Sequence, residues 1–261
     1  MSSHRPRKRF GQNFLRDRQV VERILSAADL QDTIFGIEIG PGLGVLTDEL
    51  LSRAGQVEVM EIDRDLIERL RQRQNTKLII HEGDALRLDW ERLLTRAPYK
   101  LVANLPYNIS SQILFQVLDH HALFSRLVLM FQKEVGDRLC ADPGTGDYGI
   151  LSVLCRLWFD IERITRVKPG AFHPPPKVDS VVLAFTPLAS PRVDVSDEAF
   201  FRKIVKAAFA QRRKTLANAL KSAGFEPDRV EEALVHNQLD ARIRGESLSL
   251  EQFAALANWL A

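Results

Sequence analysis

The segment Asn104-Leu105-Pro106-Tyr107 combines residue types that could act on an amine. The side-chain carbonyl of Asn104 and the backbone carbonyl of Leu105 can both accept hydrogen bonds from the exocyclic amine of an adenine. Held in this way, the amine approaches tetrahedral geometry and its lone pair can point at a methyl donor, while Pro106 stiffens the turn and Tyr107 stacks on the base. The ordinary alternative for such a string is an Asn-capped turn with a packed tyrosine.

A glycine-rich loop, Glu38-Ile39-Gly40-Pro41-Gly42-Leu43-Gly44, follows an apolar run and precedes a helical pattern. Glycines let the backbone turn sharply and approach a ligand at the edge of a sheet. The spacing departs from the dinucleotide fingerprint, because the third glycine comes one place early and Val45 takes its position. A nicotinamide-dependent oxidoreductase is therefore disfavoured, and a turn with a purely structural role is the other alternative.

Two carboxylates follow successive apolar runs at positions where a cofactor could be bound. Glu61 lies 21 residues after Gly40, at the expected end of the next strand, where it can accept hydrogen bonds from both hydroxyls of a ribose. Asp84, after the third run, can accept from the adenine amine of the same cofactor. Each alone could be a solvated strand-end residue, but their placement at successive strand ends favours an adenosine-containing cofactor.

The elements that must position these residues alternate along the first part of the chain. From residue 34 to 103, short apolar runs alternate with amphipathic, charge-rich stretches, a pattern typical of βα units with a parallel sheet. The expected strands are residues 34–39, 56–62, 77–81, 100–104, 127–132 and 178–185, with 161–168 as a further candidate. The sequence therefore predicts an α/β fold for this region.

The last part of the chain has a different pattern. Residues 186–195 are rich in proline and serine and predict a linker. Ser196-Asp197-Glu198 then begins a helical pattern, and Ser249 with Gln252 forms a capping-box signature before the last helix. We therefore expect one domain over residues 1–189 and a small helical domain over residues 190–261.

Positive charge is concentrated in two segments, although the formal net charge is only +2 and the pI is near 8.6. Residues 1–18 and 201–221 are both strongly basic, and each could follow a phosphate backbone. Two solvated helix faces are the alternative. The candidate phosphate contacts are Arg7, Lys8, Arg9, Arg212, Arg213 and Lys214.

Targeting signals and metal motifs are not evident. The first twenty residues are charged, and the longest strongly apolar run, residues 127–131, is too short to span a bilayer, so we expect a cytoplasmic protein. The two cysteines, Cys140 and Cys155, lack metal-ligand spacing and are expected to be free thiols in a reducing compartment. No metal site is expected.

Five segments in order resemble one family over nearly the whole chain, the ribosomal RNA adenine N6,N6-dimethyltransferases of the bacterial KsgA (RsmA) type. The segments are Lys8-Arg9-Phe10-Gly11-Gln12-Asn13-Phe14-Leu15, Glu38–Gly44, Asn104–Tyr107, Phe172 with Pro174–Ser180, and Phe209–Lys214. The resemblance implies a class I, Rossmann-like methyltransferase domain, a helical RNA-binding C-terminal domain, and S-adenosylmethionine as methyl donor. Its implied target is two adjacent adenosines, each methylated twice, in a hairpin near the 3′ end of small-subunit (16S) rRNA.

The resemblance also implies roles for individual residues. Those expected to contact the cofactor are Gln12, Asn13, Leu15, Gly40, Gly42, Glu61, Asp84 and Asn104. Asn104 is expected to lie between donor and target, with Leu105 and Pro106 in the same turn. Phe172 is expected to stack on the opposite face of the target base from Tyr107, although by itself it is more typical of a core aromatic. His173 is assigned no role.

The resemblance implies small-subunit ribosomal RNA within a pre-ribosomal particle as the partner. A base must be unstacked before it enters such a pocket, so the target is expected in a loop or in RNA that its particle makes accessible. The basic segments would then supply affinity and register. Nothing in the sequence suggests an obligate interface, so a monomer is expected. Two alternatives stay open: a large-subunit methyltransferase of the macrolide-resistance type, and an RNA-binding assembly factor whose methylation is secondary.

Overall fold

The computed structural model describes residue 7 and residues 11–261, and the chain divides into two compact units. The first unit comprises Met1–Gly136 and Asp160–Pro187, and the second comprises Asp137–Phe159 and Leu188–Ala261. The predicted boundary near residue 189 differs from this division chiefly because residues 137–159 belong to the second unit. The helix in this stretch is apolar on most of its surface and packs against other helices of the second unit. The local sequence shows that the helix is buried but does not show which of the two units buries it.

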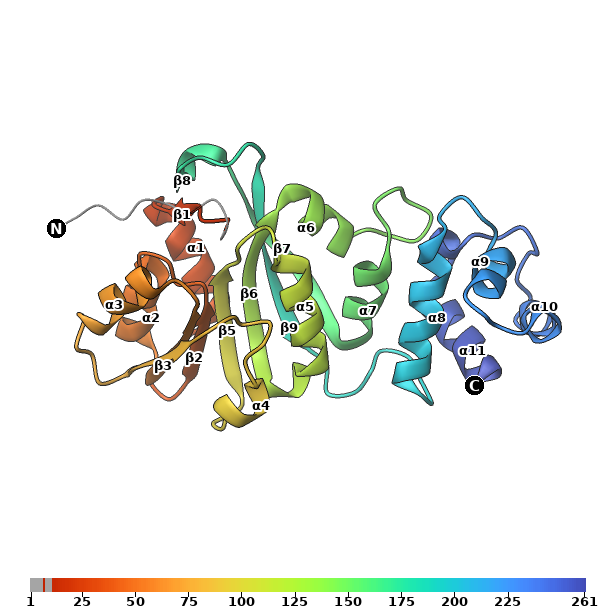
Figure 1. The fold of residues 1–261 in the computed structure, drawn as a ribbon, viewed down its shortest axis with the longest axis horizontal. Helices are drawn as coiled ribbons and strands as arrows, with labels where there is room; N and C mark the ends of the chain where they lie inside the picture. The colour runs from red at the N-terminus through yellow and green to blue at the C-terminus, as the bar shows by residue number, and fades with distance from the viewer. Residues whose placement is uncertain (1–6, 8–10) are drawn as a thin grey trace. The chain divides into compact units, whose positions relative to one another are not determined.

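A sheet with the strand order β4-β3-β2-β5-β6-β9-β7 organises the first unit (Figure 1). The strands are β2 (Phe35–Ile39), β3 (Gln56–Glu61), β4 (Leu78–Glu82), β5 (Tyr99–Asn104), β6 (Phe124–Gln132), β7 (Phe159–Val167) and β9 (Ser180–Pro187). From β4 to β6 all neighbouring strands are parallel, which confirms the predicted α/β class. Strand β9 pairs antiparallel with β6, a direction that an apolar run cannot reveal.

Helices follow the parallel strands as the βα pattern predicts. They are α2 (Val45–Arg53), α3 (Arg64–Arg71), α4 (Trp90–Leu93), α5 (Ser110–Asp119) and α6 (Lys133–Leu139), preceded by α1 (Arg18–Ala28). Helix α1 begins after Asp17, whose carboxylate accepts from two backbone N–H groups of the first turn. Its apolar residues recur at helical spacing and pack α1 against β5, β6 and β9.

A small second sheet joins residues 11–17, called here the N-terminal segment, to the region that precedes the prolines at 174–176. Strand β1 (Phe14–Leu15) pairs antiparallel with β8 (Phe172–His173), with Leu15 opposite Phe172. The backbone N–H of Arg16 also donates to the carbonyl of Ala171 at 2.8 Å. These bonds hold the N-terminal segment in place before α1 begins.

The second unit is helical. It contains α7 (Ile150–Trp158), α8 (Glu198–Ala210), α9 (Leu216–Ser222), α10 (Pro227–His236) and α11 (Leu250–Leu260). Asp197 caps α8 by accepting from the N–H of Phe200 at 2.9 Å. Ser249 and Gln252 form the predicted reciprocal capping box at the start of α11. The helical pattern predicted for this part of the chain is therefore confirmed.

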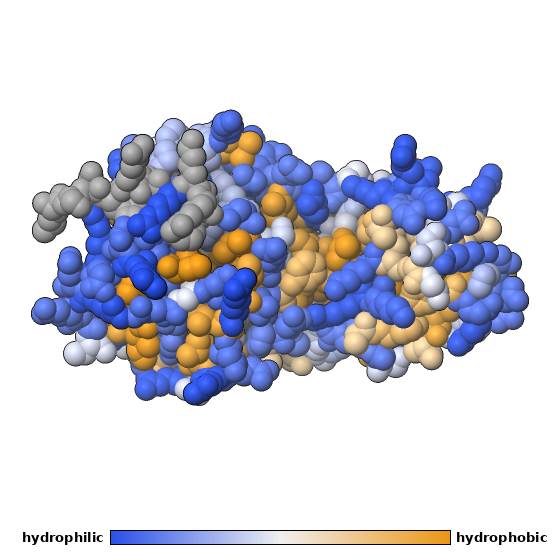
Figure 2. Space-filling view, viewed as in Figure 1, coloured by the Kyte–Doolittle hydropathy of each residue, from blue (hydrophilic) through white to orange (hydrophobic). Residues whose placement is uncertain are grey.

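Within the described part of the chain, no helix is long and apolar enough to cross a membrane. Hydrophilic residues cover most of the face seen in Figure 2, with smaller hydrophobic patches between them.

Both cysteines are free; Cys155 is buried, and burial raises the pKa of its thiol to about 12. A thiol with so high a pKa is an inert core residue.

Candidate active site

The ends of four neighbouring parallel strands surround a cavity of about 270 Å³ in the first unit. Loops at the carboxyl ends of such strands meet at one edge of the sheet, where ligands of α/β proteins bind. The cavity is lined by residues from five segments, 11–15, 38–46, 60–66, 83–85 and 104–109. All the predicted cofactor residues and the whole Asn104–Tyr107 turn are among them.

The glycine-rich loop closes one wall of the cavity by a close backbone approach. Gly40 and Gly42 have φ angles of +66° and +60°, which side chains rarely adopt. A Cβ atom on Gly42 would also lie 2.9 Å from the ring of Phe14. Glycine is thus required at Gly42 for both conformation and space, and the loop exposes its backbone to the cavity.

Glu61 ends β3 as a buried and firmly oriented carboxylate. Only 5% of the residue is exposed, and its Oε1 accepts from the backbone N–H groups of Ile62 and Asp63, each at 2.8 Å. Burial raises the pKa of the Glu61 carboxyl, whereas the backbone hydrogen bonds act in the opposite direction. Asp84 lies after β4, with Oδ1 accepting from the N–H of Leu86 at 3.0 Å. Both acids therefore have a fixed orientation beside the cavity.

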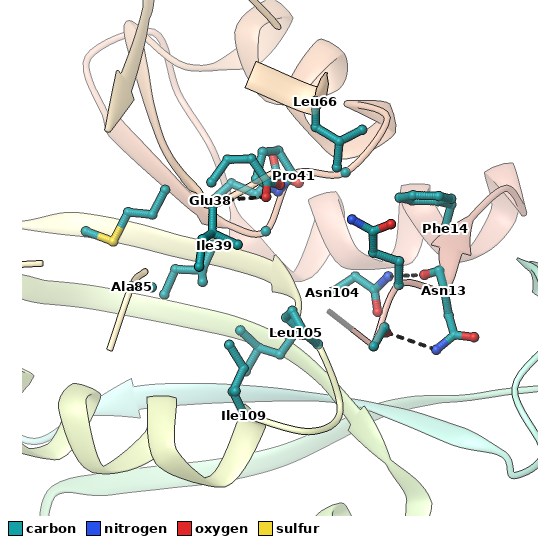
Figure 3. Close-up of a pocket in the computed structure, with 18 of the residues that line it drawn as sticks. Asn13, Phe14, Glu38, Ile39, Pro41, Leu66, Ala85, Asn104, Leu105 and Ile109 are labelled. Atoms are coloured by element: carbon teal, nitrogen blue, oxygen red, sulfur yellow. Dashed lines mark hydrogen bonds between the residues drawn. The ribbon is translucent and has the colours of Figure 1, made fainter. Parts of the chain in front are cut away.

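Asn104 at the end of β5 faces the N-terminal segment. Its side-chain nitrogen donates to the backbone carbonyl of Asn13 at 3.0 Å, and Figure 3 shows the two residues meeting across the pocket wall. Since a backbone carbonyl can only accept, this bond sets the orientation of the amide. The side-chain oxygen of Asn104 is the remaining acceptor, on a residue that lines the cavity next to Leu105.

Tyr107 completes this turn. The carbonyl of Pro106 accepts from the N–H of Ile109 at 3.1 Å, so a turn begins at Pro106 and runs to Ile109, directly after the end of β5. The hydroxyl of Tyr107 is 2.6 Å from the hydroxyl oxygen of Ser180. Burial raises the pKa of the Tyr107 phenol, which therefore stays neutral near physiological pH.

Gln12 and Arg7 connect the N-terminal segment to the start of α3. Gln12 donates to the Oδ2 of Asp63 at 3.0 Å and accepts from the backbone N–H of Arg7 at 2.8 Å. The Arg7 guanidinium pairs with Asp63 at 3.0 Å and with Asp65 at 2.5 Å. Two carboxylates thus engage the charge that was predicted to contact phosphate. The other predicted contacts of this arm, Lys8 and Arg9, lie outside the described residues.

Phe172 is not brought to the cavity. Only 4% of it is exposed, and it packs in the hydrophobic cluster that includes Leu15. This placement corresponds to the core-aromatic alternative. Removing the apolar ring from water stabilises the fold, and this free energy favours the buried position over an exposed one beside the proline-rich loop. His173 pairs with Phe14 in β8 and β1.

The three basic residues after α8 are all exposed, and Arg212 is also bonded within the second unit. Arg212 donates to the backbone carbonyls of Gly146 at 2.7 Å and Tyr148 at 3.3 Å. It also lies 3.4 Å from a carboxylate oxygen of Glu246. Arg212 therefore holds a loop of its own unit while its side chain stays partly exposed. Arg213 and Lys214 are also exposed, and the Nζ of Lys214 lies 3.5 Å from the hydroxyl oxygen of Ser222.

Glu38 is a cavity residue to which the sequence analysis assigned no role. It is 1% exposed, and its Oε2 accepts from the hydroxyl of Thr47 at 2.6 Å. Burial raises the pKa of the Glu38 carboxyl to about 8, and the nearby charge of Glu61 acts in the same direction. The available signal was an acidic residue inside an otherwise apolar strand, two positions before the first glycine of the glycine-rich loop. Acidic residues are rarely fully buried unless they are paired, and a buried one with a shifted pKa in a cavity is a candidate functional residue.

Comparison with known proteins identifies relatives over almost the full length of the chain. The family model for ribosomal RNA adenine dimethylase matches residues 3–261. A ribosomal RNA small subunit methyltransferase A from Syntrophotalea carbinolica is 63% identical over 255 residues, covering 98% of this chain and 97% of the relative. Its counterpart from Geobacter sulfurreducens is 52% identical over 265 residues, covering 98% and 95%.

Solved structures give the same result. A dimethyladenosine transferase from Plasmodium falciparum is similar with a TM-score of 0.76 and 26% identity, covering 93% of this chain and 95% of its own. The 23S rRNA methyltransferase ErmE is similar with a TM-score of 0.71 and 29% identity, covering 95% and 99%. These similarities confirm the predicted Rossmann-like methyltransferase fold with C-terminal helices. The chain belongs to the ribosomal RNA adenine dimethylase family.

Proposed function

We propose that this protein transfers methyl groups from S-adenosylmethionine to the N6 amine of adenosines in ribosomal RNA. The orientation of Asn104 carries the proposal, because its nitrogen is engaged by Asn13 and its oxygen is left as an acceptor at the cavity. Together with the carbonyl of Leu105, this oxygen can accept from both N6–H bonds and direct the lone pair of the amine. No general base is required, since the proton can leave after the transfer.

The cavity residues suit S-adenosylmethionine. Gly40 and Gly42 allow the methionine part to lie against the backbone. The oriented carboxylate of Glu61 can accept from the ribose hydroxyls, and Asp84 can accept from the adenine amine. The cavity-lining segment 12–15 would cover the bound cofactor. When bound, the cofactor supplies an electrophilic methyl group on its sulfonium.

We further propose two adjacent adenosines near the 3′ end of small-subunit rRNA as the target, each methylated twice. The names of the relatives support a small-subunit target, and the name of the family supports dimethylation. Tyr107 would stack on the extruded base. Phe172 would have to leave its buried position before it could stack on the opposite face.

The helical second unit is proposed to bind RNA around the target. Arg213 and Lys214 are exposed and can contact phosphates without reading bases. The proposed substrate is a pre-ribosomal particle in the cytoplasm, in which the target hairpin is still accessible, and the protein is proposed to act as a monomer.

Labelled S-adenosylmethionine and undermethylated small ribosomal subunits test the target directly. Dimethyladenosine should appear at two adjacent positions near the 3′ end of the small-subunit rRNA, and Asn104→Ala protein should give none. Large subunits, incubated in parallel, test the second candidate, which the similarity to ErmE favours. Label found only in large-subunit RNA would replace the proposed target with that one.

A complementation experiment tests the alternative that methylation is secondary to a role in assembly. The Asn104→Ala variant should leave a deletion strain without the modification and with part of its assembly defect. If this variant restores every phenotype of the deletion strain, the protein acts mainly as an RNA-binding assembly factor.

A further inference from the structure

Two buried serines hold opposite ends of Tyr107. The Tyr107 hydroxyl lies 2.6 Å from the Oγ of Ser180, and its backbone carbonyl accepts from the Oγ of Ser110 at 3.2 Å. Ser180 is 0% exposed and Ser110 is 1% exposed, so the serine side of each bond is shielded from water. The aromatic ring is therefore tied at its tip and at its backbone.

The serines belong to regular elements of the fold, not to the loop that carries Tyr107. Ser110 is the first residue of α5. Ser180 is the first residue of β9 and lies opposite Gln132 of β6 in the sheet. The preceding residue, Asp179, accepts at its backbone carbonyl from the N–H of Lys133 at 2.9 Å. The hydroxyl of Tyr107 is thus anchored to the sheet.

The bond to Ser180 restricts rotation of the Tyr107 side chain. To swing the ring away, the protein must expose or leave unpaired two hydroxyl groups that are now bonded to each other. A buried polar group without a partner is costly, so this movement is disfavoured. Tyr107 consequently has one preferred position before any substrate arrives.

We propose that Ser180 is a positioning residue that fixes the Tyr107 ring as a rigid surface for the target base, with Ser110 setting the position of the backbone. This inference rests on the proposed function, in which Tyr107 stacks on an adenine. Preorganisation reduces the ordering that base binding would otherwise require. The hydroxyl of Tyr107 is already bonded, so its role is to anchor the ring and not to transfer a proton.

The first test pairs kinetics on unmodified RNA with fluorescence on RNA that carries 2-aminopurine at the target position, a base that has no N6 amine and can therefore bind without being methylated. In Ser180→Ala protein, kcat/KM for RNA should fall about 10-fold, while the Kd for S-adenosylmethionine stays unchanged by calorimetry. Bound 2-aminopurine should fluoresce more strongly, because a mobile ring stacks less well. Ser152→Ala is the matched control, since its buried hydroxyl bonds to the backbone carbonyl of Arg138 in the second unit. It should change neither fluorescence nor KM.

A double-mutant cycle tests whether Ser180 acts through Tyr107. Tyr107→Phe removes the hydroxyl from the other side, so Ser180→Ala should cause little further loss in that background. Losses that multiply would overturn the proposal, as would wild-type kinetics and fluorescence in folded Ser180→Ala protein. If Ser180→Ala does not fold, Tyr107→Phe alone should reproduce the 10-fold loss, and wild-type kinetics in it would overturn the proposal.

A measurement without cofactor or RNA separates this inference from the proposed function. In spectra of the free protein with 13C-labelled tyrosine, the Tyr107 ring signals should shift and broaden in Ser180→Ala relative to wild type. Unchanged signals would refute the anchoring by Ser180. If the signals change in Ser180→Ala but the wild-type protein methylates no adenosine, the proposed function is refuted and the anchoring of Tyr107 by Ser180 still holds.

Discussion

The side-chain nitrogen of Asn104 donates a hydrogen bond to the backbone carbonyl of Asn13, at 3.0 Å and across 91 positions of sequence. Asn104 ends a central strand, and Asn13 belongs to another segment that lines the same cavity. The position of the N-terminal segment and the orientation of the Asn104 amide are therefore coupled. In the proposed reaction, this bond keeps the side-chain oxygen of Asn104 available as the acceptor for the substrate.

Replacement of Asn104 by alanine should separate catalysis from cofactor binding. The variant loses the acceptor that orients the amine, so we expect kcat to fall at least about 100-fold. The Kd for S-adenosylmethionine, measured by calorimetry, should change only a few-fold. Asn75→Ala removes a similar side chain at an exposed turn and serves as the control. Full activity of Asn104→Ala would disprove the role assigned to this residue.

Glu61→Gln should weaken cofactor binding while the fold is retained. Glutamine keeps the shape but loses the charge that strengthens two hydrogen bonds to the ribose, so the Kd should rise about 10- to 100-fold. Calorimetry measures the change. Glu91→Gln, at an exposed position on α4, should bind as wild type does. An unchanged Kd in Glu61→Gln would exclude Glu61 as the ribose partner.

Glu38 should make the cofactor-free protein less stable as the pH rises. The pKa of its carboxyl is about 8 in the folded protein and near 4.5 when unfolded, so the folded state binds more protons between these values. The free energy of unfolding should thus fall on the order of a few kcal/mol from pH 4.5 to 8. Urea unfolding at pH 5.5 and 8.5 measures the fall, which should be smaller in Glu38→Gln. An equal fall in both proteins would contradict this assignment.

Arg7→Ala tests whether the N-terminal arginine anchors its segment or contacts RNA. Loss of the pairs with Asp63 and Asp65 should raise the Kd for S-adenosylmethionine about 3- to 10-fold, since Asp63 is fully buried. The salt dependence of RNA binding should stay as in wild type. The exposed Arg18 of α1 provides a matched control, Arg18→Ala. A salt-dependence slope lower by about one would instead support the phosphate contact.

Arg212 and Arg213 are neighbours, but replacing the first should affect stability and replacing the second should affect RNA binding. Arg212→Ala leaves two backbone carbonyls without their donor and should lower the melting temperature by several degrees. Arg213→Ala should leave the melting temperature unchanged but weaken RNA binding several-fold and lower the salt slope by about one. Thermal unfolding and filter binding at several salt concentrations measure both effects. If Arg213→Ala binds RNA with wild-type affinity and slope, the proposed contact is wrong.

Residues that follow strands were placed correctly from sequence. Gly40, Glu61, Asp84 and Asn104 lie at or just after the ends of four strands, and all four line one cavity. The prediction was within reach because parallel strands bring their carboxyl ends to the same edge of a sheet. Ser249 and Gln252 could be interpreted in the same way, since a capping box involves only residues three positions apart.

Side-chain partners distant in sequence were out of reach. Arg7 was predicted to contact phosphate, and its carboxylate partners could not be foreseen because they follow more than fifty positions later. The family resemblance implied that Phe172 stacks on the target base, whereas the residue by itself was more typical of the core, and its pairing through β8 with β1 places it in the core. The bond between Tyr107 and Ser180 depends on the antiparallel pairing of β9 with β6, a direction that the sequence pattern does not show.

The amino-acid sequence by itself determined the α/β pattern, the helical end of the chain, the order of the motifs and the residues at the strand ends. These follow from periodicity, turn chemistry and capping, which act between near neighbours in the chain. Only the tertiary structure decided that Asn13 orients Asn104 and that Ser180 anchors Tyr107. Such bonds form over a few ångströms between segments whose separation is set by the packing of the whole sheet.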